Sequence, residues 1–255
     1  MEKGIAIAGT IAVDYHKIID HYAEKGMLCN ILEVAKGVGG CVTNTIINLA
    51  KIDSTIPLYA YGGVGADENG EYIIKNLKEH GVNYDGIKRF DDELTAFTDA
   101  MIIESTGERT FFVAKGANRV FSYEDIDFDS IRTDLFHMGY ALLMDPFDKD
   151  DEEFGTVMAR TLARVQAKGI KTSIDLVSVD DERYTDIVLP TLKYCTYFIF
   201  NEIEAGKTAG LSPYGLDGTP KEDNIRRICE KVLDAGVLVL PLLCMMVQSY
   251  PMKKT

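Results

Sequence analysis

Short apolar runs alternate with amphipathic helical patterns along most of the chain. Runs of about four to eight apolar residues bounded by Gly, Asn or Asp are typical of strands, whereas apolar spacings of three and four indicate helices. The pattern predicts strands in residues 4–10, 56–65, 134–140, 170–176, 196–201 and 237–243. It predicts helices in 43–52, 68–81, 151–169, 183–195, 202–211 and 222–236. This alternation builds βαβ units, so we expect an α/β fold with a mostly parallel sheet covered on both faces.

Two segments interrupt the alternation. Residues from about 15 to 36, and a predicted hairpin from about 95 to 116, carry strand patterns with no helix between the strands. A small antiparallel sheet attached to the parallel sheet would accommodate both, and such a flap over the strand ends would act as a water-excluding lid. We therefore expect a single domain over residues 1–255 with this lid inserted, and we treat 237–255 as an atypical tail.

The composition narrows the classes of partner. A chain of 255 residues with 46% hydrophobic content can bury the core of one large domain. The formal net charge of −13 argues against a nucleic acid or an anionic membrane as partner, because phosphate groups are bound by clustered Lys and Arg.

The sequence also predicts a cytoplasmic protein. The first residues lack the pattern of a secretory signal, and the longest apolar run contains Pro241 and is too short to span a bilayer. The five cysteines form no C-x-x-C pair and no zinc pattern with the histidines. We therefore expect reduced thiols.

Polar or glycine residues follow several of the predicted strands. They are Asp14, Gly62, Gly63, Asp175 and Asn201. In open parallel sheets ligands bind beyond the carboxyl ends of the strands. The sequence therefore predicts a binding site at these positions.

Two phosphate-binding motifs are incomplete. Gly206-Lys207-Thr208 resembles the end of a P-loop, but Asn201 stands where the first glycine is required, so we interpret the segment as helix. The run Gly62 to Asp67 lacks the third glycine of a dinucleotide fingerprint. A Rossmann-type nucleotide-binding protein is therefore the weakest of the functional hypotheses. Asn201 and Glu204 fit either a helix cap or a site for phosphate and Mg²⁺.

The order of five motifs is more specific than any one of them. Asp14 follows the first strand, Gly39-Gly40 opens a helix that contains Asn44, and GGVGADENG, GAN and Asn-Glu-x-Glu follow in 62–70, 116–118 and 201–204. In this order and spacing the chain resembles the ribokinase family of sugar kinases, also called the phosphofructokinase-B family, as far as about residue 236. The resemblance implies a ribokinase-like three-layer α/β/α core with a small antiparallel β lid.

The resemblance also implies roles for the substrate-side residues. Asp14 would accept hydrogen bonds from sugar hydroxyls, and Asn44 would bind another hydroxyl. Gly39 and Gly40 would let the backbone approach the sugar ring, where a side chain would take its place. The substrate would be a sugar or nucleoside, phosphorylated on a hydroxymethyl group.

On the nucleotide side the resemblance implies that Asn201 touches the phosphates of ATP and that Glu204 organises Mg²⁺. Asp175 corresponds to a position near the phosphates where the family often has Asp-x-Asn. This chain has Val177 in place of the second polar residue, so it departs from the family pattern at this position.

The family's catalytic base is an aspartate in a Gly-Ala-Gly-Asp segment whose backbone amides form an anion hole. The printed sequence has no such segment after residue 236. We therefore expect that the C-terminal part of the core is missing, that no catalytic residue lies in this chain, and that it is a poor kinase or none. The alternative is a non-catalytic sugar-binding protein on the same scaffold. The strand edges of the lid suggest a homodimer.

Overall fold

The computed structural model describes residues 4–237. Apart from Val237, the predicted last strand and the tail lie outside the described residues. The chain divides into two compact units, residues 1–127 and 128–255. Within residues 4–237 no helix is both long enough and apolar enough to cross a membrane.

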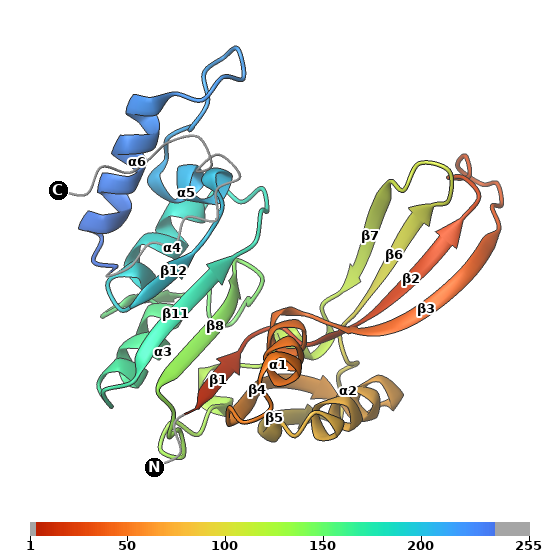
Figure 1. Ribbon diagram of the computed structural model, residues 1–255, viewed down its shortest axis with the longest axis horizontal. Coiled ribbons are helices and arrows are strands. Elements are labelled where there is room, and N and C mark those ends of the chain that lie inside the picture. Colours follow the sequence, from red (N-terminus) through yellow and green to blue (C-terminus); the bar gives the residue numbers. More distant parts are fainter. Residues whose placement is uncertain (1–3, 238–255) are drawn as a thin grey trace. The chain divides into compact units, whose positions relative to one another are not determined.

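The first unit contains a parallel three-stranded arrangement with two helices (Figure 1). Its strands run in the order β1, β4 and β5 and its helices are α1 and α2: β1 (Ile5–Ala8), β4 (Leu58–Gly65), β5 (Asn83–Phe90), α1 (Cys41–Ile52) and α2 (Glu68–Glu79). The apolar residues that recur at helical spacing are buried. Examples are Val42 and Ile46 in α1, and Ile73 and Leu77 in α2. The periodic apolar positions therefore place these helices as predicted.

The two segments that interrupt the alternation form a second sheet in the same unit (Figure 1). We call it the lid sheet. Its strands, in spatial order, are β3 (Ile31–Gly39), β2 (Ala12–Ile19), β6 (Phe97–Ile103) and β7 (Arg109–Ala114). Each outer pair is an antiparallel hairpin, whereas the inner strands β2 and β6 pair in parallel. Two short 3₁₀ helices follow, η1 (Gly116–Arg119) and η2 (Tyr123–Asp125).

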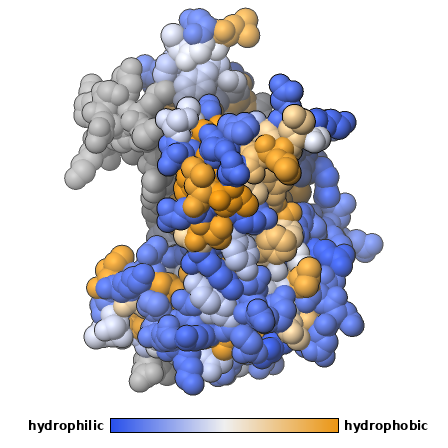
Figure 2. All heavy atoms as spheres, turned by 90° about the vertical axis from the view of Figure 1, so that its right-hand side faces the viewer, coloured by the Kyte–Doolittle hydropathy of each residue, from blue (hydrophilic) through white to orange (hydrophobic). Residues whose placement is uncertain are grey.

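Large apolar side chains are exposed on the outer strands of the lid sheet. Val34 in β3 is 57% exposed, and Phe111, Phe112 and Val113 in β7 are 57%, 54% and 66% exposed. Figure 2 faces the lid sheet and shows apolar side chains gathered there. These side chains lie on the two edge strands of the sheet and, in β7, alternate between its faces, and exposed apolar edge strands favour pairing with another strand.

One carboxylate ties the base of the lid sheet to α2. Asp67 caps the helix by accepting the N–H of Gly70 at 2.8 Å, and it also accepts the backbone N–H of Thr95 at 2.8 Å and the Thr95 hydroxyl at 2.6 Å. Burial acts to raise the pKa of Asp67, but the hydrogen bonds from Thr95 and Gly70 outweigh it and lower this pKa below 3.8. The bonds therefore stabilise the ionised form.

Replacing Asp67 with Ala should lower the free energy of unfolding by about 1–2 kcal/mol at pH 7, because the cap and its bonds are lost. A depressed carboxyl pKa adds stability above its unfolded-state value, and this stability is lost as pH falls through the folded-state pKa. The loss of unfolding free energy caused by Asp67→Ala should therefore become smaller as pH falls below 3.8. Urea unfolding at pH 7 and pH 3 measures it, with the exposed Asp92→Ala as control. An equal cost at both pH values would contradict the prediction.

The second unit repeats the parallel arrangement (Figure 1). Its strands lie in the order β12, β11 and β8, beside a two-stranded hairpin, β9–β10, and four helices: β8 (Leu135–Ala141), β9 (Asp150–Asp151), β10 (Gly155–Thr156), α3 (Val157–Gln166), β11 (Lys171–Leu176), α4 (Tyr184–Leu192), β12 (Tyr197–Ile199), α5 (Glu202–Ala209) and α6 (Glu222–Asp234). Gly206, Lys207 and Thr208 lie inside α5, which confirms that they belong to a helix. The parallel sheet with helices and the small lid sheet confirm the predicted α/β fold class.

The predicted start of the helix at residue 151 is wrong. The carboxylate of Asp151 accepts the backbone N–H groups of Glu153 and Phe154 at 3.1 and 2.9 Å, which closes a turn between β9 and β10. The helix α3 begins after Thr156, whose hydroxyl accepts the N–H of Ala159 at 3.1 Å. An aspartate that bonds its own local backbone competes with the helix, so the acidic run forms a turn.

Candidate functional site

The predicted site residues fall into both units. The substrate-side residues lie in the first unit and the nucleotide-side residues in the second: Asp14, Gly39, Gly40 and Asn44, then Asp175, Asn201 and Glu204. Each group is held by its own local structure.

Asp14 and Gly39 lie against each other in the lid sheet. Asp14 is half-buried in β2, where its backbone pairs with Gly37 of β3. A Cβ on Gly39 would lie only 2.3 Å from the Asp14 Cγ and Oδ2 atoms, so the carboxylate fills the space that a side chain would need. We find no hydrogen bond or ion pair to this carboxylate from residues 4–237. Its oxygens are therefore open to donors from a ligand.

Gly40 is confined by backbone rather than by a side chain. It precedes α1 with φ of 84°, and a Cβ there would lie 2.5 Å from the Thr10 carbonyl oxygen and 2.9 Å from the Ile11 Cα. Both conditions favour glycine. Contacts within the protein therefore explain why glycine is required at both Gly39 and Gly40. That the pair also admits a sugar ring stays a prediction.

Asn44 lies one turn into α1 and is exposed. Its backbone N–H bonds to the Gly40 carbonyl oxygen at 3.1 Å, so the main chain belongs to the first helical turn. The exposed side-chain amide can offer both a donor and an acceptor. It is suited to a hydroxyl group, and its contact with substrate stays a prediction.

Asn118 is a buried polar residue to which the sequence analysis assigned no role. It lies in η1 and is 6% exposed, and its side-chain amide bonds both the N–H and the carbonyl oxygen of Ile11 at 3.0 Å. The signal in the sequence was the asparagine of the GAN motif directly after the second lid hairpin. Nothing local identified its partner, which lies 107 residues away.

Asn201 and Glu204 form a capping box at the start of α5. The Asn201 side chain accepts the Glu204 N–H at 2.8 Å, and Glu204 Oε2 accepts the Asn201 N–H at 2.9 Å. The hydroxyl of Ser178 donates to Glu204 Oε1 at 2.8 Å. Burial together with the charge of Glu204 raises the pKa of Tyr184. The capping role is observed, while the phosphate and metal roles stay predictions.

Glu204 is 6% exposed and both of its oxygens accept protein hydrogen bonds. A carboxylate has further lone pairs for a hydrated cation. In the described part of the chain, no three His, Cys, Asp or Glu side chains gather closely enough to hold a metal ion alone. Mg²⁺ is usually held by one or two carboxylates with waters and substrate phosphates, so Glu204 fits a water-mediated contact.

Asp175 holds a turn at the end of β8. Its Oδ1 accepts the backbone N–H of Tyr140 at 2.7 Å and lies 3.7 Å from Nε2 of the buried His137. Tyr140 has a φ of 60°, a left-handed conformation that is uncommon for a non-glycine residue. The ring of His137 in turn bonds the Ser173 hydroxyl through Nδ1 at 2.8 Å. A nucleotide contact by Asp175 stays a prediction.

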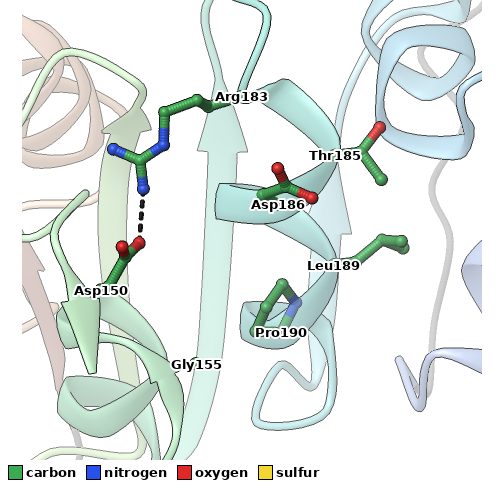
Figure 3. A pocket seen from close by; sticks show the side chains of 7 residues that line it. All are labelled: Asp150, Gly155, Arg183, Thr185, Asp186, Leu189 and Pro190. Carbon is green, nitrogen blue, oxygen red and sulfur yellow. Dashed lines mark hydrogen bonds and ion pairs between the residues drawn. The ribbon is translucent and has the colours of Figure 1, made fainter. Parts of the chain in front are cut away.

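The second unit also has an open hollow of about 470 Å³ between the β9–β10 hairpin and α4 (Figure 3). Arg183 and Asp150 form an ion pair of 2.5 Å on one side of it, and Asp186 projects from α4 beside them. Its lining residues are Asp150, Gly155, Arg183, Thr185, Asp186, Leu189 and Pro190. None of the predicted site residues lines this hollow.

Known proteins share parts of this sequence. Residues 6–239 match the family described as pfkB family carbohydrate kinase. The chain is 30% identical over 115 residues to a protein named "Probable fructokinase-6, chloroplastic" from Arabidopsis thaliana, covering 44% of this chain and 29% of the relative. It is 31% identical over 84 residues to a ribokinase of Schizosaccharomyces pombe, covering 32% and 26%. The matches thus span less than a third of these relatives.

Solved structures share the fold. A ribokinase of Arabidopsis thaliana, complexed with ribose and ATP, superposes with a TM-score of 0.76 at 20% identity, over 96% of this chain and 72% of the other. A ribokinase from Giardia lamblia gives a TM-score of 0.77 at 18% identity, over 95% and 74%. The family match extends from β1 to the end of the described residues and confirms the resemblance inferred from the motif order. The chain belongs to the pfkB family of carbohydrate kinases.

Proposed function

We propose that the chain has the sugar site and scaffold of an ATP-dependent kinase, which transfers the γ-phosphoryl group to a hydroxymethyl group of a sugar or nucleoside, and that its own rate of transfer is low because no catalytic base is predicted in its sequence. The observation that carries the proposal is the Asp14 carboxylate. It is half-buried beside Gly39 and has no bonding partner among residues 4–237. A partly buried anion without a protein donor is costly unless a ligand supplies one, and sugar hydroxyls are suitable donors.

The substrate side would consist of Asp14, Asn44 and the backbone at Gly39 and Gly40. Hydrogen bonds to an ionised acceptor are worth about 1.5–3 kcal/mol each, so Asp14 would supply most of the polar binding energy. Asn44 would bind a second hydroxyl group. The glycine pair would leave room for the ring.

The nucleotide side would consist of Asn201, Glu204 and Asp175. Asn201 would donate its amide to a phosphate oxygen, and Glu204 would hold Mg²⁺ through water. The ion would neutralise charge on the phosphates. Asp175 would keep the Tyr140 turn in place at the end of β8. Phosphoryl transfer depends mainly on positioning and charge, which suits residues held by buried hydrogen bonds.

Calorimetric titration of the chain with ribose, fructose and adenosine tests the proposal, followed by detection of ADP and sugar phosphate after addition of ATP and Mg²⁺. Saturable binding of one of these compounds, with phosphorylation that is slow because no catalytic base is predicted in this chain, is the expected result. Binding without phosphorylation would favour the alternative, a sugar-binding protein on this scaffold. No binding of any of them would refute the proposal.

We also propose that two copies of the chain associate through the lid sheet. Its outer strands β3 and β7 expose Val34, Phe112 and Val113, and unpaired edge strands with apolar side chains favour pairing with another strand. Light scattering during size-exclusion chromatography measures the mass directly. A monomer at all accessible concentrations would refute this association.

A further inference from the structure

The connection from β1 to β2 leaves one sheet and enters another. Thr10 and Ile11 lie in it, and their exposed fractions are 7% and 0%. Backbone N–H and C=O groups buried in such a crossing need partners outside the regular ladders of either sheet. The structure supplies these partners from two distant segments.

The first partner is Asn118. Its Nδ2 donates to the Ile11 carbonyl oxygen, and its Oδ1 accepts the Ile11 N–H, both at 3.0 Å. A side-chain amide offers one acceptor and a donor, as a peptide group does. Asn118 therefore pairs with Ile11 much as a neighbouring strand would. Since Asn118 follows β7, this pairing joins the start of β2 to the end of the second lid hairpin.

The second partner is the N-terminus of α1. Gly40 cannot cap this helix with a side chain, and Thr10 takes over that function. The Thr10 hydroxyl accepts the N–H of Cys41 at 3.2 Å, and the Thr10 carbonyl oxygen accepts the N–H of Val42 at 3.1 Å. The first N–H groups of a helix otherwise lack partners. The same connection therefore holds both β2 and α1.

We propose that Asn118 and Thr10 are positioning residues for the proposed sugar site, and the proposal rests on that proposed function. Asp14 lies three residues beyond Ile11 on β2, and the glycine pair directly precedes Cys41. With Ile11 fixed by Asn118 and the helix start fixed by Thr10, Asp14 and α1 keep a constant separation. When a sugar binds, Asp14 and α1 are already in place, so no further conformational entropy is lost in positioning them.

Amide hydrogen exchange tests the positioning without a ligand. Asn118→Ala should speed exchange at residue 11, and Thr10→Val should speed exchange at residue 41, each by about tenfold or more, while amides in α2 keep their rates. Thr10→Ser retains the hydroxyl and should exchange like the wild type. Unchanged rates at these residues, or an equal increase throughout the first unit, would overturn the proposal.

Sugar affinity tests the consequence. With the sugar that the wild-type chain binds best, Asn118→Ala and Thr10→Val should raise the Kd about tenfold, and Thr10→Ser should leave it nearly unchanged. Ile73→Val, a fully buried change in α2, controls for lost stability alone and should not alter the Kd. If Ile73→Val weakens binding equally at equal loss of stability, the positioning role is refuted.

Hydrogen exchange and sugar affinity together distinguish a failure of the proposed function from a failure of the positioning role. If the wild-type chain binds none of the sugars, the proposed function fails, and the exchange rates still decide whether Asn118 and Thr10 hold this connection. If Asn118→Ala does not fold, the near-isosteric Thr10→Val carries both measurements, because it leaves the pairing between Asn118 and Ile11 in place.

Discussion

Replacing Gly40 with Ala should lower the free energy of unfolding by roughly 2–6 kcal/mol. With a ψ of 158°, Gly40 occupies a backbone region that is essentially restricted to glycine and costs another residue about 1–3 kcal/mol, and overpacking adds about 1–3 kcal/mol. Gly40 has a φ of 84°, and its Cβ would lie 2.5 Å from the Thr10 carbonyl oxygen. Because the colliding atoms are backbone of the β1–β2 connection, no side chain can rotate to relieve the contact.

Gly26 provides a control for the positive φ of Gly40. Its φ of 86° is nearly the same, but a Cβ there would meet nothing within 4 Å. Gly26→Ala should therefore show only the conformational cost of about 1–2 kcal/mol. Urea unfolding of both variants separates this cost from the cost of the collision. Equal losses of stability would show that the surroundings of Gly40 do not matter.

Gly39→Ala should reduce sugar affinity about a hundredfold while costing less stability than Gly40→Ala. Gly39 has no left-handed φ, so alanine fits its backbone, but the new Cβ would lie 2.3 Å from the Asp14 carboxylate. A carboxylate at the end of a side chain can rotate away. It would then leave its position in the proposed site, which forfeits about 2.8 kcal/mol of binding if the hydrogen bonds to Asp14 are lost. Calorimetric titration measures the loss.

A double-mutant cycle identifies the cause. In an Asp14→Ala background the colliding atoms are absent, so Gly39→Ala should change neither stability nor affinity further, and the two changes should be strongly non-additive. Gly37→Ala is the control in the same strand, since a Cβ at Gly37 meets nothing within 4 Å. Additive effects of Gly39→Ala and Asp14→Ala would contradict the prediction.

The sequence predicted those elements whose signals are local. Apolar periodicity located α1 and α2, and the alternation of strands and helices predicted the α/β class. Hydrogen bonds between residues close in the sequence could also be predicted. Asn201 and Glu204 form a capping box at α5, one of the two roles predicted for them, and Ser122 and Asp125 form another at η2. These features depend on residues a few positions apart, so a single sequence contains them.

Non-local features escaped prediction. The strand β5 was missed because it lies at an edge of its sheet and is mostly polar, with the sequence NYDGIKRF. The neighbour that requires Gly39 is Asp14, 25 positions earlier in the chain (39 − 14). The partner of Asn118 is Ile11, and no pattern near either residue indicates the contact. The topology of the lid sheet determines these contacts, and a pattern of apolar positions does not encode them.

The parallel pairing of β2 with β6 also sets an order of events during synthesis. Val13 pairs with Phe97, 84 positions later in the chain (97 − 13). At about 5–20 residues per second, a ribosome needs roughly 4–17 s to make the intervening segment. Throughout that interval the β2–β3 hairpin has an open inner edge that can pair with other nascent chains. Chaperone binding to the emerging polypeptide should therefore be strongest before β6 has left the exit tunnel.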